Sequence, residues 1–164
     1  YFAWGEVEPD SSYNWPDYKW CKGNQKTFTK YCTCNDDGTV DNKTELESAD
    51  DAAVINWGGS WRMPTEEEMQ ELVDNCTWIW TSLNGVEGSL ATGPNGNSIF
   101  FPVGGYKLFD RLEGAENGYY YSKSLRVLSF CDSKGAWNLQ VCFSGTGVGG
   151  CTRMNGTAIR PVCP

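Results

Sequence analysis

The sequence predicts an α+β fold in which two helices pack on a twisted antiparallel sheet with long irregular loops. Three observations carry this prediction: an aromatic-rich start without periodicity, two helical patterns before residue 80, and short apolar segments separated by Gly, Asn and Pro after it. The chain of 164 residues has the length of one ordinary domain. We therefore expect a single domain over residues 1–164, with an irregular layer at 1–45, helices at 46–80 and strands at 81–164.

The first layer is predicted to be irregular because Tyr, Trp, Pro and Asn follow one another there without a sustained period. Its end, residues 35–44, is a polar run of strong turn formers. Asp36, Asp37 and Asp41 in this run could ligate calcium, but the glutamate that ends the calcium-loop pattern is missing. The sequence favours a solvated turn here, with a calcium loop as the alternative.

The first helix is expected at about residues 46–57. It would begin near Ser48, because Asp50 and Asp51 suit the positive end of a helix dipole. It would stop at Gly58 and the glycine that follows.

The second helix is expected at residues 65–76 and has the clearest local signal in the chain. Thr65 as the N-cap and Glu68 three residues later form a capping box. An apolar face follows at helical spacing and needs another element to pack on; it consists of Met69, Leu72, Val73 and Cys76.

Short apolar segments predict strands at residues 99–103, 119–122, 137–143 and 158–162. A glycine-rich stretch at residues 144–150 lies between the last two. Glycines at this density cannot support a helix and weaken a strand, so we expect a loop or a loose hairpin there.

Charge and hydropathy exclude several kinds of partner. Lysine and arginine number 13 against 21 acidic residues, and the net charge of −8 repels nucleic acid and anionic lipid surfaces. No apolar run approaches the length of about 20 residues that a membrane helix needs, so we expect no direct membrane insertion. No basic segment followed by an apolar one opens the chain, as we expect of a mature or excised polypeptide.

Eight cysteines are a high number for a cytosolic domain of this size and predict an oxidising compartment with some disulfides. Zinc is the competing interpretation. Cys32 and Cys34 are separated by a single residue, and no second close pair accompanies them, so we expect no metal site.

The absence of histidine excludes catalytic machinery that depends on this side chain as a general base. Paired carboxylates could serve a glycosidase, and the nearest pairs are Glu6 with Glu8 and Glu113 with Glu116. Neither pair lies in a context that would raise the pKa of one carboxyl over the other, so we expect surface acids. The sequence predicts no enzyme and no cofactor.

The segment 119–156 mixes Tyr, Arg, Lys and large apolar residues without clean alternation in a turn-rich stretch. Tyr and Arg on irregular backbone contribute contact area and hydrogen bonds at low entropic cost, which is typical of recognition surfaces. The alternative is that Leu128, Phe130 and Val141 are core residues and that the polar ones form a rim.

Several motifs carry a family likeness. The most specific are WRMPT at residues 61–65, ahead of the capped helix, and RPV at residues 160–162. YFAWGEVEP at residues 1–9 and GYYYS at residues 118–122 extend the likeness over nearly the whole chain. Together they resemble the secreted major-paralogous-domain family of gut Bacteroidetes. This resemblance implies a C-type-lectin-like fold, the framework of variable proteins of diversity-generating retroelements.

The resemblance also implies a ligand-recognition or adhesin module, secreted or displayed on the cell surface, whose ligand is a protein or glycan on another cell or virus. A rigid framework, including Trp137, Arg153 and Arg160, would carry a changeable C-terminal binding face. The ligand-binding positions implied are Tyr121, Lys123, Arg126, Leu128, Phe130, Asp132, Gln140, Cys142, Val148, Cys151 and Met154.

By analogy with the lectin-like fold, Cys76 would pair with Cys163, and Cys21 with Cys32 or Cys34. The paired signatures of calcium-dependent sugar binding are absent, so that activity is not expected. Two alternatives remain: a structural domain of a cell-surface fibre or envelope, and an enzyme related to the sulfatase-modifying enzymes that share this fold. The enzyme would need a reactive cysteine pair or a bound metal.

Overall fold

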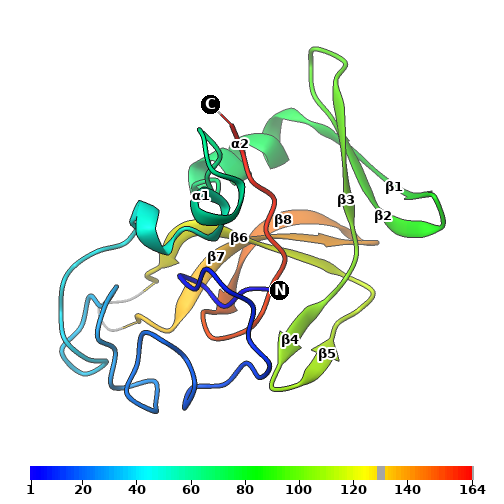
Figure 1. The fold of residues 1–164 in the computed structure, drawn as a ribbon. Helices are drawn as coiled ribbons and strands as arrows, with labels where there is room; N and C mark the ends of the chain where they lie inside the picture. Colours follow the sequence, from blue (N-terminus) through cyan, green and yellow to red (C-terminus); the bar gives the residue numbers. More distant parts are fainter. Residues whose placement is uncertain (129–131, 164) are drawn as a thin grey trace.

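The computed structural model describes residues 1–128 and 132–163 and confirms a mixed α+β architecture with antiparallel sheets (Figure 1). The sheets have the strand orders β1-β2-β3, β4-β5 and β6-β7-β8. The helical elements are a 3₁₀ helix (Ser48–Asp50), α1 (Ala52–Trp57) and α2 (Glu66–Asn75). The strands are β1 (Thr77–Leu83), β2 (Val86–Thr92), β3 (Ser98–Pro102), β4 (Tyr106–Leu108), β5 (Arg111–Glu113), β6 (Gly118–Arg126), β7 (Gly135–Cys142) and β8 (Gly145–Thr152).

Residues 1–47 form an irregular layer in which single backbone bridges take the place of helices and strands. Several of their aromatic side chains are buried: Tyr13, Tyr18 and Phe28 pack with Cys32 in one cluster. Side-chain packing therefore holds a backbone that lacks regular hydrogen-bond ladders.

The second helix confirms its sequence signal. The hydroxyl of Thr65 accepts from the backbone N–H of Glu68 at 3.2 Å, and the Glu68 carboxylate accepts from the backbone N–H of Thr65 at 2.9 Å. These reciprocal bonds satisfy N–H groups that the first turn of a helix leaves unpaired. No helix in the described part of the chain is long and apolar enough to span a membrane.

The first helix begins later than predicted. Asp51 caps α1 instead of lying in its first turn, because its carboxylate accepts from the backbone N–H groups of Ala53 and Val54 at 2.9 and 3.2 Å. The residues before Asp51 form the 3₁₀ helix. The helix ends at Gly58, as predicted.

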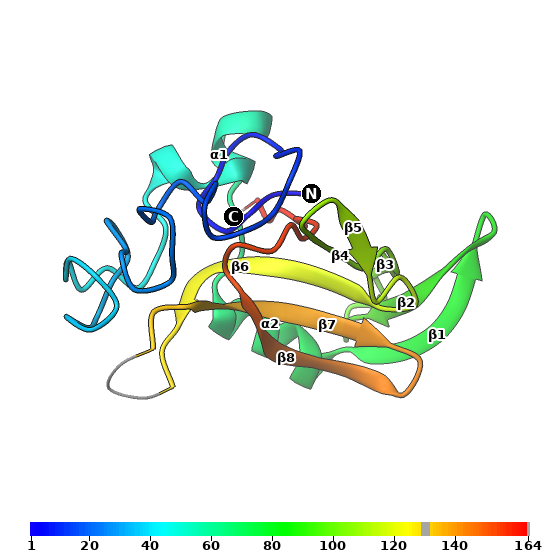
Figure 2. The ribbon, with the colours of Figure 1, turned by 90° about the horizontal axis from the view of Figure 1, so that it is seen from below.

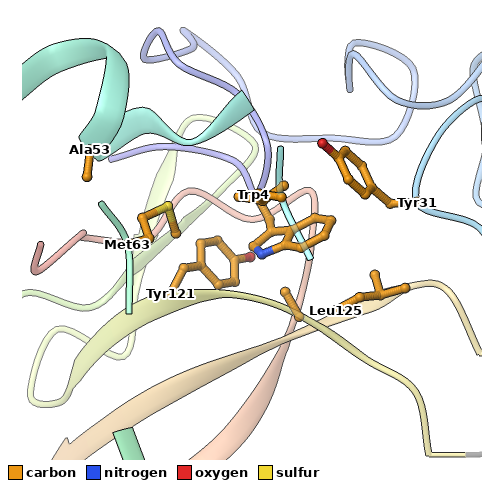
Figure 3. Close-up of a cluster of buried hydrophobic side chains, with 8 residues drawn as sticks. Trp4, Tyr31, Ala53, Met63, Tyr121 and Leu125 are labelled. Carbon is orange, nitrogen blue, oxygen red and sulfur yellow. The ribbon is translucent and has the colours of Figure 1, made fainter. Parts of the chain in front are cut away.

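The β6-β7-β8 sheet lies between two layers (Figure 2). The helix α2 covers one face, where Met69 packs with Tyr120 and Leu139. The helix α1 and the N-terminal layer cover the other face, where Trp4 packs against Tyr121 (Figure 3). Both faces of this sheet are therefore occupied by core packing.

Three predicted strands correspond closely to β3, β6 and β7. The β1-β2 hairpin is absent from the prediction. It turns at Asn84 and Gly85, whose φ angles are 52° and 82°. An Asn-Gly pair with both φ angles positive is a strong hairpin signal, so this element was accessible from the sequence.

Two predictions for the C-terminal part have different outcomes. Of the two alternatives for the glycine-rich stretch, the structure shows the hairpin: the strand β8 pairs with β7 along its length. Residues 158–162 are not assigned as a strand; bridges hold only their ends, from Tyr120 to Ala158 and from Arg62 to Val162. We call residues 158–163 the C-terminal segment.

The disulfides implied by the resemblance are not formed. Cys21 and Cys76 are free thiols, which rules out a Cys76–Cys163 bond and any bond from Cys21 to Cys32 or Cys34. Cys34 is disulfide-bonded. The expected pairs therefore contribute nothing to stability.

The polar run at residues 35–44 uses its carboxylates internally. Asp37 is buried and pairs with Lys134 at 3.1 Å. The Asp41 carboxylate accepts from the backbone N–H groups of Tyr31 and of the next residue, both at 2.9 Å. Across the described ranges, no three His, Cys, Asp or Glu side chains gather as they would around a metal. The turn interpretation is the one that these contacts support.

Candidate functional site

Four of the eleven expected ligand-binding residues pack against the hydrophobic core. Tyr121 is fully buried within the cluster around Trp4 (Figure 3), and its hydroxyl donates to the carbonyl of Thr152 at 2.6 Å. Cys151, Val148 and Met154 are half-buried, each against a different buried cluster. Contrary to expectation, Tyr121 presents no surface to a ligand, because a side chain on this strand lies beneath α1 and the N-terminal layer.

Two further expected residues already have partners within the protein. The Lys123 ammonium pairs with Glu45 at 3.1 Å. The Arg126 guanidinium lies 5.3 Å from the ring centroid of Trp137, within the range of a cation–π contact. Both side chains are half-buried, so a ligand would have to compete with these contacts.

The remaining expected residues do not gather on one face. Gln140 and Cys142 lie at the end of β7, whereas Leu128 and Asp132 lie beyond the end of β6, next to the start of β7. At about 3.3 Å per residue, the two ends of β7 are roughly 23 Å apart. Leu128 is 58% exposed, and Phe130 lies outside the described residues. The expected face is therefore not a single continuous surface.

A hollow of about 550 Å³ lies along the C-terminal segment. Two exposed tryptophans line it, with Trp57 50% and Trp61 40% exposed. We call this hollow the tryptophan groove; its walls include Trp57, Trp61, Ile99, Arg160, Pro161 and Val162. Exposed tryptophans in a concave surface are typical of ligand sites, because their large rigid rings bury much area on binding.

The end of α1 brings the two tryptophans to the surface. Gly58 and Gly59 have φ angles of 68° and 59°, a region in which other residues are strained. The chain reverses there, so Trp57 ends the helix and Trp61 follows the turn. The buried Asp51 fixes this loop, because its carboxylate also accepts from the backbone N–H of Met63 at 2.9 Å.

Arg62 fixes the C-terminal segment beside the same loop. Its backbone N–H donates to the carbonyl of Val162 at 3.0 Å, and the Val162 N–H donates back to Arg62 at 2.9 Å. The Arg62 guanidinium also forms a two-pronged pair with Glu68 at 2.7 and 2.6 Å. This pairing lowers the pKa of Glu68 and ties the segment to the start of α2.

Arg160 is a cation of the groove whose described internal contact is a cation–π contact with Phe101. Its guanidinium makes no hydrogen bond or ion pair with any residue that the structure describes, and it lies 5.7 Å from the Phe101 ring centroid. It is half-buried, so its charge is less screened than that of a fully exposed arginine. A guanidinium in this setting can hold a carboxylate through two parallel hydrogen bonds.

Glu6 departs from the expectation that it is an ordinary surface acid. It is buried, and burial together with a side-chain hydrogen bond to Asp10 raises its pKa from 4.5 to about 7. Its Oε1 accepts from the backbone N–H of Lys19 at 2.8 Å. The prediction that no paired carboxylate has a raised pKa is therefore wrong: Asp10, which the sequence analysis did not pair with Glu6, supplies the second carboxyl group.

Two thiols have pKa values that oppose reactivity. Burial raises the pKa of Cys21 and of Cys151 above the ordinary value, so both are protonated at neutral pH. Because the thiolate is the nucleophile, these thiols are less reactive than an exposed cysteine.

The sequence analysis assigns no ligand contact to Trp57, Trp61 or the Arg160 side chain. No local signal marks Trp57, because it lies four residues after the buried Ala53 and therefore on the same face of the helix. What the sequence does not contain is the proximity of Trp61 to Val162, which depends on a bridge between segments about a hundred residues apart.

In comparisons with known proteins, the chain matches no protein-family description, no curated protein and no solved structure. The protein is a mainly antiparallel α+β protein with an aromatic groove beside its C-terminal segment.

Proposed function

We propose that the protein is a ligand-recognition module and that the tryptophan groove is its binding site. The observation that carries this proposal is the presence of two exposed tryptophans beside an arginine that has no hydrogen-bonding or anionic partner among the described residues. Tryptophan and arginine are the residues most enriched among those that dominate binding energies. Leaving both rings exposed has a cost in water that a bound ligand removes.

The wider proposal is a secreted or surface-displayed adhesin with a C-type-lectin-like fold, whose ligand is a protein or glycan on another cell or virus. Its support is the motif resemblance, the number of cysteines and the acidic net charge of −8. The raised pKa values of Cys21 and Cys151 make these two thiols poor candidates for a nucleophile.

Glycan and peptide arrays test the proposal directly. We expect the wild-type protein to give signals that fall at least about tenfold in a Trp57→Ala/Trp61→Ala double variant, because both rings contact the ligand. Phe143→Ala is the matched control: Phe143 is 80% exposed but lies at the β7-β8 turn. Thermal unfolding of all three proteins checks that the folded population is unchanged.

Equal signals for the wild type and the double variant would overturn the groove as the binding site. No signal for any protein, together with obligate oligomerisation, would instead favour the structural-module alternative. The feature that suits that alternative is the β1-β2 hairpin, where Ile79, Leu83 and Val86 are exposed.

We further propose that some C-terminal positions diversify among related genes. Lys123, Arg126, Leu128, Gln140 and Cys142 are all at least partly exposed and are the positions expected to vary. The buried expected residue, Tyr121, should stay constant together with the framework. Sequencing this gene across many isolates of its source population checks this, and an even scatter of changes would contradict it.

A further inference from the structure

An apolar pocket of about 150 Å³ opens beside the tryptophan groove. Its walls come from α2 (Met69 and Leu72), β3 (Ile99 and Phe101) and the β6-β7-β8 sheet (Leu139), with the C-terminal segment on one side. A cavity of this volume with apolar walls has room for one benzene-sized group. The pocket is therefore large enough for a single aromatic or branched aliphatic side chain.

The charges at this pocket do not cancel. Two charged residues, Glu68 and Arg160, line its wall. Glu68 is already neutralised by its two-pronged pair with Arg62, at 2.7 and 2.6 Å. Arg160 lacks an anionic partner among the described residues, so the three side chains together leave one positive charge.

The surroundings of Arg160 indicate where its charge lies. It is close to Phe101 and electrostatically coupled to Tyr120, whose pKa burial raises to about 12 while Arg160 opposes this rise. The Tyr120 hydroxyl itself donates to the carbonyl of Pro102 and is therefore already used. The charge of Arg160 thus lies next to aromatic pocket walls and is available to a ligand.

The pocket and the tryptophan groove are adjacent. Four residues line both hollows: Ile99, Arg160, Pro161 and Val162. An extended ligand in the groove can therefore place its end in the pocket. Arg160 lies in the wall that the two hollows share, where the end of such a ligand would pass.

We propose that this pocket binds the carboxyl-terminal residue of a polypeptide, with an aromatic or branched aliphatic side chain in the apolar cavity and the terminal carboxylate on Arg160. The proposal rests on the proposed function and makes it more specific, because it assigns a protein ligand with an accessible carboxyl terminus. Its carrying observation is the combination of a benzene-sized apolar cavity with one uncompensated positive charge.

Fluorescence polarisation with short labelled peptides tests this. The probes are a Gly-Gly-Ser-Gly-Phe peptide as the free acid, the same peptide as the amide, and a free acid that ends in Gly. We expect the Phe acid to bind about tenfold more tightly than the amide, since only the acid can form charge-assisted hydrogen bonds with Arg160. The Gly acid should lose at least about tenfold, because no ring enters the cavity.

Protein variants then test whether Arg160 causes the preference for the acid over the amide. Arg160→Gln should remove the difference between acid and amide, and Arg160→Lys should retain part of it because the charge remains. Arg111→Gln is the matched control, since Arg111 is exposed on β5 and lines neither hollow. Methyl shifts of Leu72, Ile99 and Leu139 in NMR spectra should follow the titration with the Phe acid.

Three results would overturn the proposal: no binding of the Phe acid up to millimolar concentration, equal binding of acid and amide, or an acid preference that survives in Arg160→Gln. These results are separable from failure of the proposed function. If array ligands are lost in the Trp57→Ala/Trp61→Ala variant while the peptide acid does not bind, the groove stands and the pocket proposal fails. If the peptide acid binds while the Trp57→Ala/Trp61→Ala variant keeps the wild-type array signals, the pocket proposal stands and the groove fails as the binding site.

Discussion

Arg153 and Arg160 lie seven positions apart in very different surroundings. The Arg153 side chain is fully buried, and its guanidinium donates to the Tyr18 hydroxyl at 2.8 Å and to the carbonyls of Lys30, Tyr31 and Ser133 at 2.8 to 3.0 Å. The resemblance implied a framework role for Arg153, and these contacts agree with it. Arg160 has no such contacts with the described residues and is free to bind a ligand.

Glu6 makes stability depend on pH at the level of a single residue. Its folded-state pKa of about 7 lies above the ordinary value of 4.5, so the folded protein binds this proton more tightly than the unfolded chain. Its contribution is fully present below pH 4.5 and is lost as the pH rises through 7. We expect the wild-type free energy of unfolding to fall by about 2 kcal/mol from pH 5 to pH 8 on this account.

Urea denaturation at several pH values measures this slope. The Glu6→Gln variant, which resembles the protonated acid, should lack that part of the pH dependence. Glu87→Gln is the control, because Glu87 is exposed on β2 and should keep the wild-type slope. Identical slopes for the wild type and Glu6→Gln would show that Glu6 has an ordinary pKa in the folded protein.

Among the elements, β8 shows how a regular strand can hold so many glycines. A side chain at Gly150 would meet Arg126, with the nearest atom 2.2 Å from its Cβ, and one at Gly149 would meet Gln140 at 2.5 Å. These glycines leave room for long side chains of the neighbouring strands, so their absence of side chains serves packing rather than flexibility. Sequence alone does not show which side chain lies across a strand.

Gly147 has open space around it and Gly150 does not, so substitutions at these two positions of β8 form a matched pair. Nothing lies within 4 Å of a Cβ at Gly147, so Gly147→Thr should stabilise the protein by about 0.5–1 kcal/mol through better strand propensity. Gly150→Thr should destabilise it by about 1–3 kcal/mol, because Arg126 must leave its place over Trp137. Chemical denaturation measures both, and equal effects would contradict the packing role of Gly150.

Elements fixed by local signals were predictable, and elements fixed by distant partners were not. The capping box identified α2 nearly to the residue, because its hydrogen bonds join positions three residues apart. Residues 158–162 read as a strand, yet their partners are Tyr120 and Arg62, and only their ends are bridged. A short apolar run gives no information about whether a neighbouring strand lies within reach.

At the scale of the whole molecule, the α+β class and the two helices followed from the sequence, whereas the candidate site did not. The expected face depended on which side chains of β6 to β8 point outward, and both faces of that sheet are covered by core packing. The tryptophan groove forms where α1, the loop after it and the C-terminal segment meet. Such a meeting depends on tertiary contacts that no local pattern encodes.

The central claim is that recognition takes place at the tryptophan groove. The most direct test is to take the tightest ligand from the arrays and record intermolecular NOEs to the assigned side chains of the protein. We expect contacts with Trp57, Trp61 and Arg160. Contacts confined to Leu128 and the β7-β8 turn, with none in the groove, would contradict the account and return the binding site to the face that the sequence analysis first indicated.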